Sequence, residues 1–185
     1  MNDLLLLWLP ILVTAVAVFV ASSLIHMVFK WHNLDYKKLT NEDAVLAAIR
    51  AGSPEPGQYV LPHCADMKDL QTEELQKKFR EGPVGFMTLK RPGPPTIGGA
   101  LGKWFVFNLA VAGIVGVIAL RMYGLQADPR RAAHLVGVLS LLTYSGGSVQ
   151  QGIWMGKPWG SVAKDLLDGA IYATVSALSF WWLWP

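Results

Sequence analysis

The side chains best suited to chemistry lie between Ser145 and Tyr172, where polar and charged residues interrupt a hydrophobic sequence. A polar side chain is costly at membrane depth, so its position usually reflects a partner, a cavity or an interface. We therefore expect the main functional or assembly surface to be formed by Ser148, Gln150, Gln151, Lys157, Lys164, Asp165, Asp168 and Tyr172.

Two polar faces pass through this region at helical spacing. The first comprises Ser140, Tyr144, Ser148 and Gln151, and the second comprises Asp165, Asp168, Tyr172, Ser176 and Ser179. Facing stripes could form interhelical hydrogen bonds, which contribute about 0.6–2 kcal/mol each, or they could line a path for a solute or protons. The two aspartates also follow Ser161, a candidate N-cap, where acids suit the helix dipole. We favour helix packing and keep the path as the alternative.

A second chemical cluster is His63-Cys64-x-x-Met67, which offers imidazole, thiolate and thioether groups within five residues. This soft donor set suits copper, the one cofactor that the sequence suggests. The favoured alternative is a small buried cysteine beside a surface histidine. A nucleophilic Cys64 is a third interpretation, but only His63 is identifiable as its base. Because the chain has one cysteine, an internal disulfide is excluded, as expected in a reducing compartment.

Two other patterns are weak. The glycines of 98–103 resemble a phosphate-binding loop, but Trp104 stands where that motif requires Ser or Thr, so close packing explains them better. His26 and His134 could in principle hold a haem, yet we expect them near opposite membrane faces.

The elements that position these residues are predicted from charge-free sequence. Hydrophobic residues make up 52% of the 185-residue chain and charged residues only 16%, unlike a typical soluble domain. Runs without Asp, Glu, Lys or Arg cover 4–29, 104–120, 132–156 and 169–185. A bilayer core needs about 20 apolar helical residues, so four transmembrane helices fit, the second and fourth being short. Asp3 and the absence of a basic N-region argue against a signal peptide.

The fold class is therefore an all-α membrane protein with a small cytoplasmic α+β insertion between the first two transmembrane helices. The expected divisions are 1–29 for helix 1, 30–103 for the insertion and 104–185 for helices 2–4. In the insertion we predict helices starting at Thr40, as N-cap, and Thr72, and strands over 59–61 and 84–89. Its eleven basic and nine acidic residues argue against a nucleic-acid partner.

The orientation follows from the basic residues, of which thirteen of sixteen lie in 30–103 or in the turn carrying Lys157 and Lys164. The positive-inside rule then predicts both termini in the periplasm and 30–103 in the cytoplasm. Four tryptophans fall at each expected interface, as an aromatic belt requires: Trp31, Trp104, Trp154 and Trp159 inside, and Trp8, Trp181, Trp182 and Trp184 outside.

Three segments, 59–64 (YVLPHC), 82–86 (GPVGF) and 148–168 (SVQQGIWMGKPWGSVAKDLLD), resemble a family of small multipass bacterial inner-membrane proteins with no assigned function. The resemblance implies a bacterial origin and the inner membrane, but no activity and no site residues. From the residues themselves we expect a non-catalytic protein in the lipid bilayer, acting as an accessory or scaffold subunit with other membrane subunits or with itself. The alternative is a small transport or copper-handling protein, and an enzyme comes third.

Overall fold

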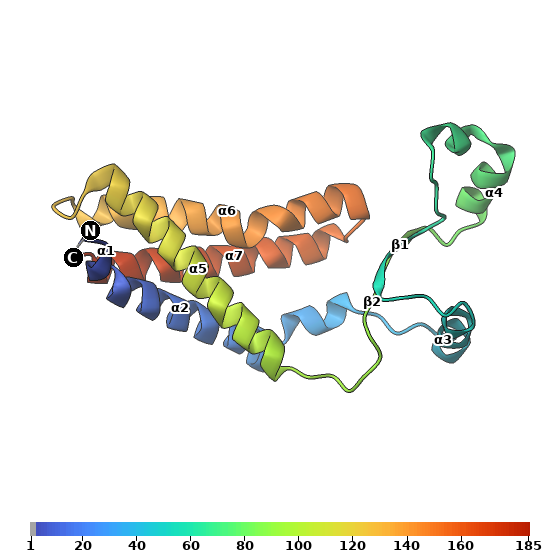
Figure 1. Ribbon diagram of the computed structural model, residues 1–185, viewed down its shortest axis with the longest axis horizontal. Helices are drawn as coiled ribbons and strands as arrows, with labels where there is room; N and C mark the ends of the chain where they lie inside the picture. The colour runs from blue at the N-terminus through green and yellow to red at the C-terminus, as the bar shows by residue number, and fades with distance from the viewer. Residues whose placement is uncertain (1–2) are drawn as a thin grey trace. The chain divides into compact units, whose positions relative to one another are not determined.

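The computed structural model describes residues 3–185 and is mostly helical, with four helices long and apolar enough to cross a membrane. Figure 1 shows the order of the elements along the chain. The helices of the membrane part are α1 (Asp3–Leu6), α2 (Trp8–Ser23), the π-helix η1 (Leu24–Phe29), the 3-10 helix η2 (Trp31–Asp35), α5 (Gly98–Tyr123), α6 (Pro129–Met155) and α7 (Trp159–Leu183). Between η2 and α5 lie α3 (Glu42–Ala51), β1 (Gly57–Leu61), η3 (Met67–Gln71), α4 (Glu73–Glu81) and β2 (Gly85–Leu89). The predicted fold class, four long apolar helices with a small α+β segment between the first two, is thus confirmed.

The chain divides into two compact units, one formed by 1–36 with 96–185 and the other by 37–95. The first unit contains the four long helices together with η2, so residues 30–36, which we expected in the insertion, pack with the membrane helices. This placement matters for the site, because η2 carries Trp31, His32 and Asp35.

In the helical unit, α2 packs on α5 and α7, and α6 packs on α5 and α7, so the four helices form a ring. They run side by side, with α1 and the C-terminus at the same end (Figure 1). One apolar cluster at that end joins Leu7, Leu120, Ala132, Phe180 and Trp184. A second cluster, toward the other end, joins Val18, Ile25 and Tyr172. The exposed large side chains elsewhere on the bundle suit contact with lipid.

Two sequence-based expectations about the spans are wrong. The second span, α5, has 26 residues and the fourth, α7, has 25, so neither is short. The charge-free criterion cut α5 at Lys103 and α7 at Asp168, although a helix can continue through a charged residue near the membrane surface or facing a polar partner. Ser161 is also not the N-cap of α7, because the helix begins at Trp159 with Pro158 as its cap.

The turn between α6 and α7 follows from its residues. Gly156 adopts a left-handed conformation with φ 69°, which ends α6 in the way that glycine favours. Pro158 then occupies the N-cap position of α7. The close antiparallel pairing of α6 and α7 places the end of one polar stripe beside the start of the other.

The second unit holds a two-stranded antiparallel sheet in which Tyr59 pairs with Met87. The helix α4 begins one residue later than predicted, because Thr72 is its N-cap and accepts a hydrogen bond from the Leu75 amide. Thr40 does not cap α3: the N-cap is Asn41, and it makes no side-chain capping bond. A Thr-x-x-Asp pattern offers a shorter acid than the Glu or Gln of a capping box, so it specifies the helix start less firmly.

Candidate functional site

A cavity of about 580 Å³ opens at the end of the helical unit where α5 and α7 begin and α6 ends. Its lining is unusually polar for a membrane bundle, because it includes one histidine, one lysine, two aspartates and two tyrosines. The polar lining residues are Ser22, Ser23, His26, Thr143, Tyr144, Ser148, Gln151, Lys157, Asp165, Asp168 and Tyr172.

Asp168 is the most deeply buried charged residue of this site, being 6% exposed. Its Oδ2 lies 2.8 Å from Nε2 of His32 and 3.9 Å from Nε2 of His26. The Trp31 indole donates a hydrogen bond of 3.2 Å to Oδ1. In the described part of the chain, the ion-pair partners of Asp168 are these two histidines, so no Lys or Arg neutralises it directly.

His32 lies between two carboxylates. Its Nδ1 is 3.0 Å from Oδ2 of Asp35, on the other side of the ring from Asp168. The η2 helix makes this possible, because residues 32 and 35 are one turn apart on the same face.

Lys164 of α7 holds η2 in place. Its ammonium donates to the Trp31 carbonyl and to Oδ1 of Asp35, both at 2.7 Å. The hydrogen bond from Lys164 holds the pKa of the Asp35 carboxyl below its usual range, and the His32 contact adds to the effect. Asp35 is therefore ionised at neutral pH, when it can accept from both neighbours.

His26 belongs to the π-helix η1, which ends at Lys30 in a left-handed conformation with φ 54°. Single π turns occur often at functional sites because the extra residue changes the direction of the side chains. The His26 ring lies parallel to that of His32, with 5.0 Å between ring centroids. Its Nδ1 donates to the Ser22 carbonyl at 3.0 Å, so its Nε2 points away from its own helix backbone.

A second charged group lies on the α6–α7 side of the cavity. Asp165 accepts hydrogen bonds from both Ser148 and the Lys157 ammonium. Lys157 lies in the turn and also approaches Ser148, at 3.5 Å. The two predicted stripes therefore meet here as a neutralised pair with a hydroxyl partner.

An aromatic wall completes the cavity. Tyr144 and Tyr172 pack edge to face at 5.4 Å, and Trp104 packs against both. The Tyr144 hydroxyl donates to Oδ1 of the fully buried Asn108, and the Trp104 indole donates to Ser22. These bonds fix the bundle around the polar residues.

The structure brings together most, though not all, of the residues expected from the sequence. Among them, the cavity is lined by Ser148, Gln151, Lys157, Asp165, Asp168 and Tyr172. Lys164 joins the site through Asp35, whereas Gln150 is exposed and does not line the cavity. Deeper in the stripe, Ser176 and Ser179 donate to carbonyls of their own helix, so these hydroxyls do not link helices.

The expected copper cluster lies in the other unit. His63 is exposed, Met67 is 77% exposed, and the Cys64 thiol donates a hydrogen bond of 2.9 Å to the Asp66 carbonyl. The copper site stays a prediction.

Sequence reasoning missed His32 and Asp35, assigned Trp31 only to the aromatic belt and expected His26 only near one membrane face. The available signal was the His32-x-x-Asp35 spacing shortly after a span that carries His26 near its end. That pattern is short, and nothing local indicates that it faces Asp168, more than 130 residues later in the chain.

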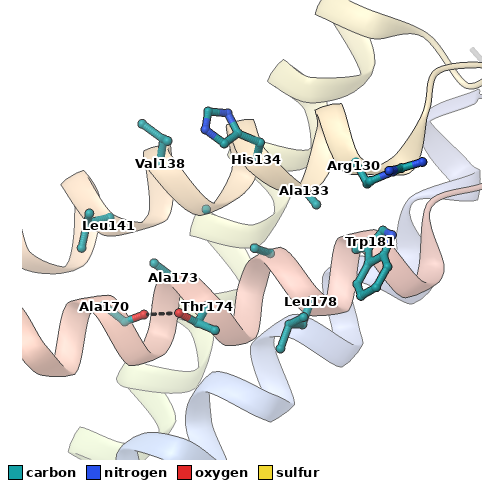
Figure 2. A pocket seen from close by; sticks show the side chains of 12 residues that line it. Arg130, Ala133, His134, Val138, Leu141, Ala170, Ala173, Thr174, Leu178 and Trp181 are labelled. Atoms are coloured by element: carbon teal, nitrogen blue, oxygen red, sulfur yellow. Dashed lines mark hydrogen bonds between the residues drawn. The ribbon is translucent and has the colours of Figure 1, made fainter.

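A second hollow of about 600 Å³ lies between α6 and α7 nearer the other end, and Figure 2 shows its lining side chains. Its lining includes small residues such as Ala133, Gly137 and Ala173, together with His134 and Trp181. The lining is almost wholly apolar, which suits lipid chains or another helix better than a polar ligand.

Comparison of the chain with protein-family models, curated proteins and solved structures found no match. The function is therefore argued from the geometry of the site.

Proposed function

We propose that this chain is a bacterial inner-membrane protein that binds a small polar or charged solute in the cavity between α2, α5, α6 and α7. This is the transport or metal-handling class that the sequence offered as its alternative. The observation that carries it is the convergence of both polar stripes on one cavity. If their role were only to join helices, the hydroxyls deeper in the bundle would bond across it, whereas Ser176 and Ser179 bond within α7.

The charges of the cavity also support binding. Asp165 and Asp35 have lysine partners, so they are stable without a solute. Asp168 is buried and, among the residues that the structure describes, forms ion pairs with histidines alone, so it is the group whose charge a bound cation could balance. We place this end of the bundle at the cytoplasmic face, because Lys30, Lys103, Lys157 and Lys164 lie near it.

Thiol accessibility tests both the cavity and the orientation. Cys64 is the single cysteine, so Cys64→Ala gives a cysteine-free background into which Gln151→Cys is introduced. A membrane-impermeant maleimide should modify this variant in inside-out vesicles and leave it unmodified in right-side-out vesicles. Ser140→Cys is the matched control on the same helix, because Ser140 is fully buried and should stay unmodified in both. Absence of reaction at Gln151→Cys from either side contradicts an open cavity, and reaction from the periplasmic side reverses the orientation.

An accessory role in a membrane complex is the second candidate, favoured by the groove of small residues between α6 and α7. Its test is native mass spectrometry of the protein extracted in mild detergent, where co-purifying subunits or a dimer would support it. Replacing Gln150 and Gln151 together by leucine should weaken such a complex without blocking insertion. Replacing each glutamine singly by leucine separates solute binding from complex formation, because Gln151 lines the cavity and Gln150 does not.

A further inference from the structure

We infer that His26, His32 and Asp168 bind a divalent first-row transition-metal ion, of the Zn²⁺ or Fe²⁺ class, at the edge of the cavity. This inference rests on the proposed function, since it names the class of solute. One nitrogen from each histidine and one oxygen of Asp168 all lie within 4.8 Å of one another. Ligand atoms around one ion, each about 2.0–2.2 Å from it, are separated by roughly 3–3.5 Å. The 2.8 Å and 3.9 Å separations to Asp168 bracket that range, and one imidazole would turn out of the parallel stack to close the site.

Each imidazole has a partner at Nδ1 that suits metal binding through Nε2. The Ser22 carbonyl can only accept, so Nδ1 of His26 carries the proton and its Nε2 has a free lone pair. Asp35 can accept from Nδ1 of His32 in the same way, and a metal ion at Nε2 would take the place of the contact that this nitrogen makes with Asp168. Metal-binding histidines characteristically donate their second nitrogen to a carboxylate or a backbone carbonyl, which fixes the tautomer and the ring direction. Here each histidine has one such partner.

The charges around Asp168 also favour a bound metal ion. A buried carboxylate is stable only with a countercharge, and the two nearby lysines are engaged with Asp165 and Asp35. A metal ion bridging Asp168 and the histidines supplies that charge. The competing arrangement is an imidazolium His32 that donates to Asp35 and Asp168 at once, without any metal.

The donor set selects the kind of metal. Two imidazole nitrogens and one carboxylate oxygen, without thiolate, suit borderline divalent ions and do not suit Cu⁺. Three protein ligands also leave at least one position for water or a solute. His26 and Asp168 both line the cavity, so that open position would face it.

The test is metal binding to the purified full-length protein in detergent. After chelation, the protein is titrated with Zn²⁺ and with Co²⁺, and bound metal is measured by elemental analysis and calorimetry. We expect one ion per chain. His26→Gln should weaken binding by at least tenfold while leaving the fold intact, because the His26 side chain is 52% exposed. Asp35→Asn, which alters the partner of His32 and also weakens the ion pair with Lys164, should weaken it about 10- to 100-fold.

His134→Gln is the matched control, since His134 lines the separate α6–α7 groove, and it should bind like the wild type. The Co²⁺ spectrum should lack a thiolate band and be unchanged by Cys64→Ala. Wild type without stoichiometric Zn²⁺ or Co²⁺, or equal affinity in His26→Gln and wild type, would overturn the site in favour of the imidazolium bridge. Gln151→Cys would still react in that case, so failure of the metal site is distinguishable from failure of the cavity.

Discussion

The helices α6 and α7 pack tightly at Gly169, one residue from Asp168, and this contact gives a sharp test of the packing that forms the cavity. A Cβ added at Gly169 would lie 2.6 Å from Cβ and 3.0 Å from Oγ of Ser145. Carbon atoms pack at about 3.5–4.0 Å, so Gly169→Ala must push the helices apart by roughly 1 Å. Overpacking of this kind costs about 1–3 kcal/mol.

Gly147→Ala on α6 is the matched control, because nothing lies within 4 Å of its added Cβ. Both substitutions gain the same helix propensity, roughly 0.5–1 kcal/mol, so the difference between the two variants isolates the clash. The assay is thermal unfolding in mild detergent, where 1–3 kcal/mol corresponds to about 2–12 °C for a chain of this size.

Ser145→Gly supplies the rescue. It removes the Cβ and Oγ that the new methyl group would meet and leaves the Ser145 Cα at 3.4 Å, an ordinary contact. The double variant should therefore unfold near the temperature of Ser145→Gly alone, a coupling that neighbouring residues commonly show. Equal stability of Gly169→Ala and Gly147→Ala, or a double variant no better than Gly169→Ala, would refute the close approach of the two helices.

Three further outcomes are expected. Reporter fusions after Tyr36 and Gly124 should show cytoplasmic and periplasmic activity respectively, and the reverse pattern would make a periplasmic copper site far more plausible. If Cys64 is only a packing residue, Cys64→Ser should lower the free energy of unfolding by about 1 kcal/mol, seen as a slightly lower unfolding temperature, while Cys64→Ala should not. Neither variant should then change the copper content, whereas loss of bound copper in both variants would support Cys64 as a ligand. Because Lys164 lowers the pKa of Asp35, this pair should stabilise the protein fully above the ordinary range of an aspartate and lose its effect as the pH falls through the lowered pKa. Acid titration of wild type against Asp35→Asn, followed by near-UV circular dichroism, would show this as a component absent from the variant.

The sequence predicted the membrane part well because its signals are local. Charge-free runs of helical length give spans regardless of the rest of the fold. The end of α6 at Gly156 and the start of α4 after Thr72 also follow from residues within one turn. Errors occurred where the local signal was ambiguous, as at Lys103, which we used to delay the start of α5 although it lies within the helix.

The candidate site also has one part that follows from the sequence and another that depends on the tertiary structure. The sequence alone determined that Ser148, Asp165 and Asp168 share faces of two adjacent helices, because helical periodicity fixes the face. Their meeting across a short turn followed from the proximity of the two helices along the chain. Only the tertiary structure decided that η2 folds back onto α7, so that Lys164 holds Asp35 and His32 contacts Asp168. Such pairings join residues more than 125 positions apart, and they depend on packing around the whole bundle, which no local pattern specifies.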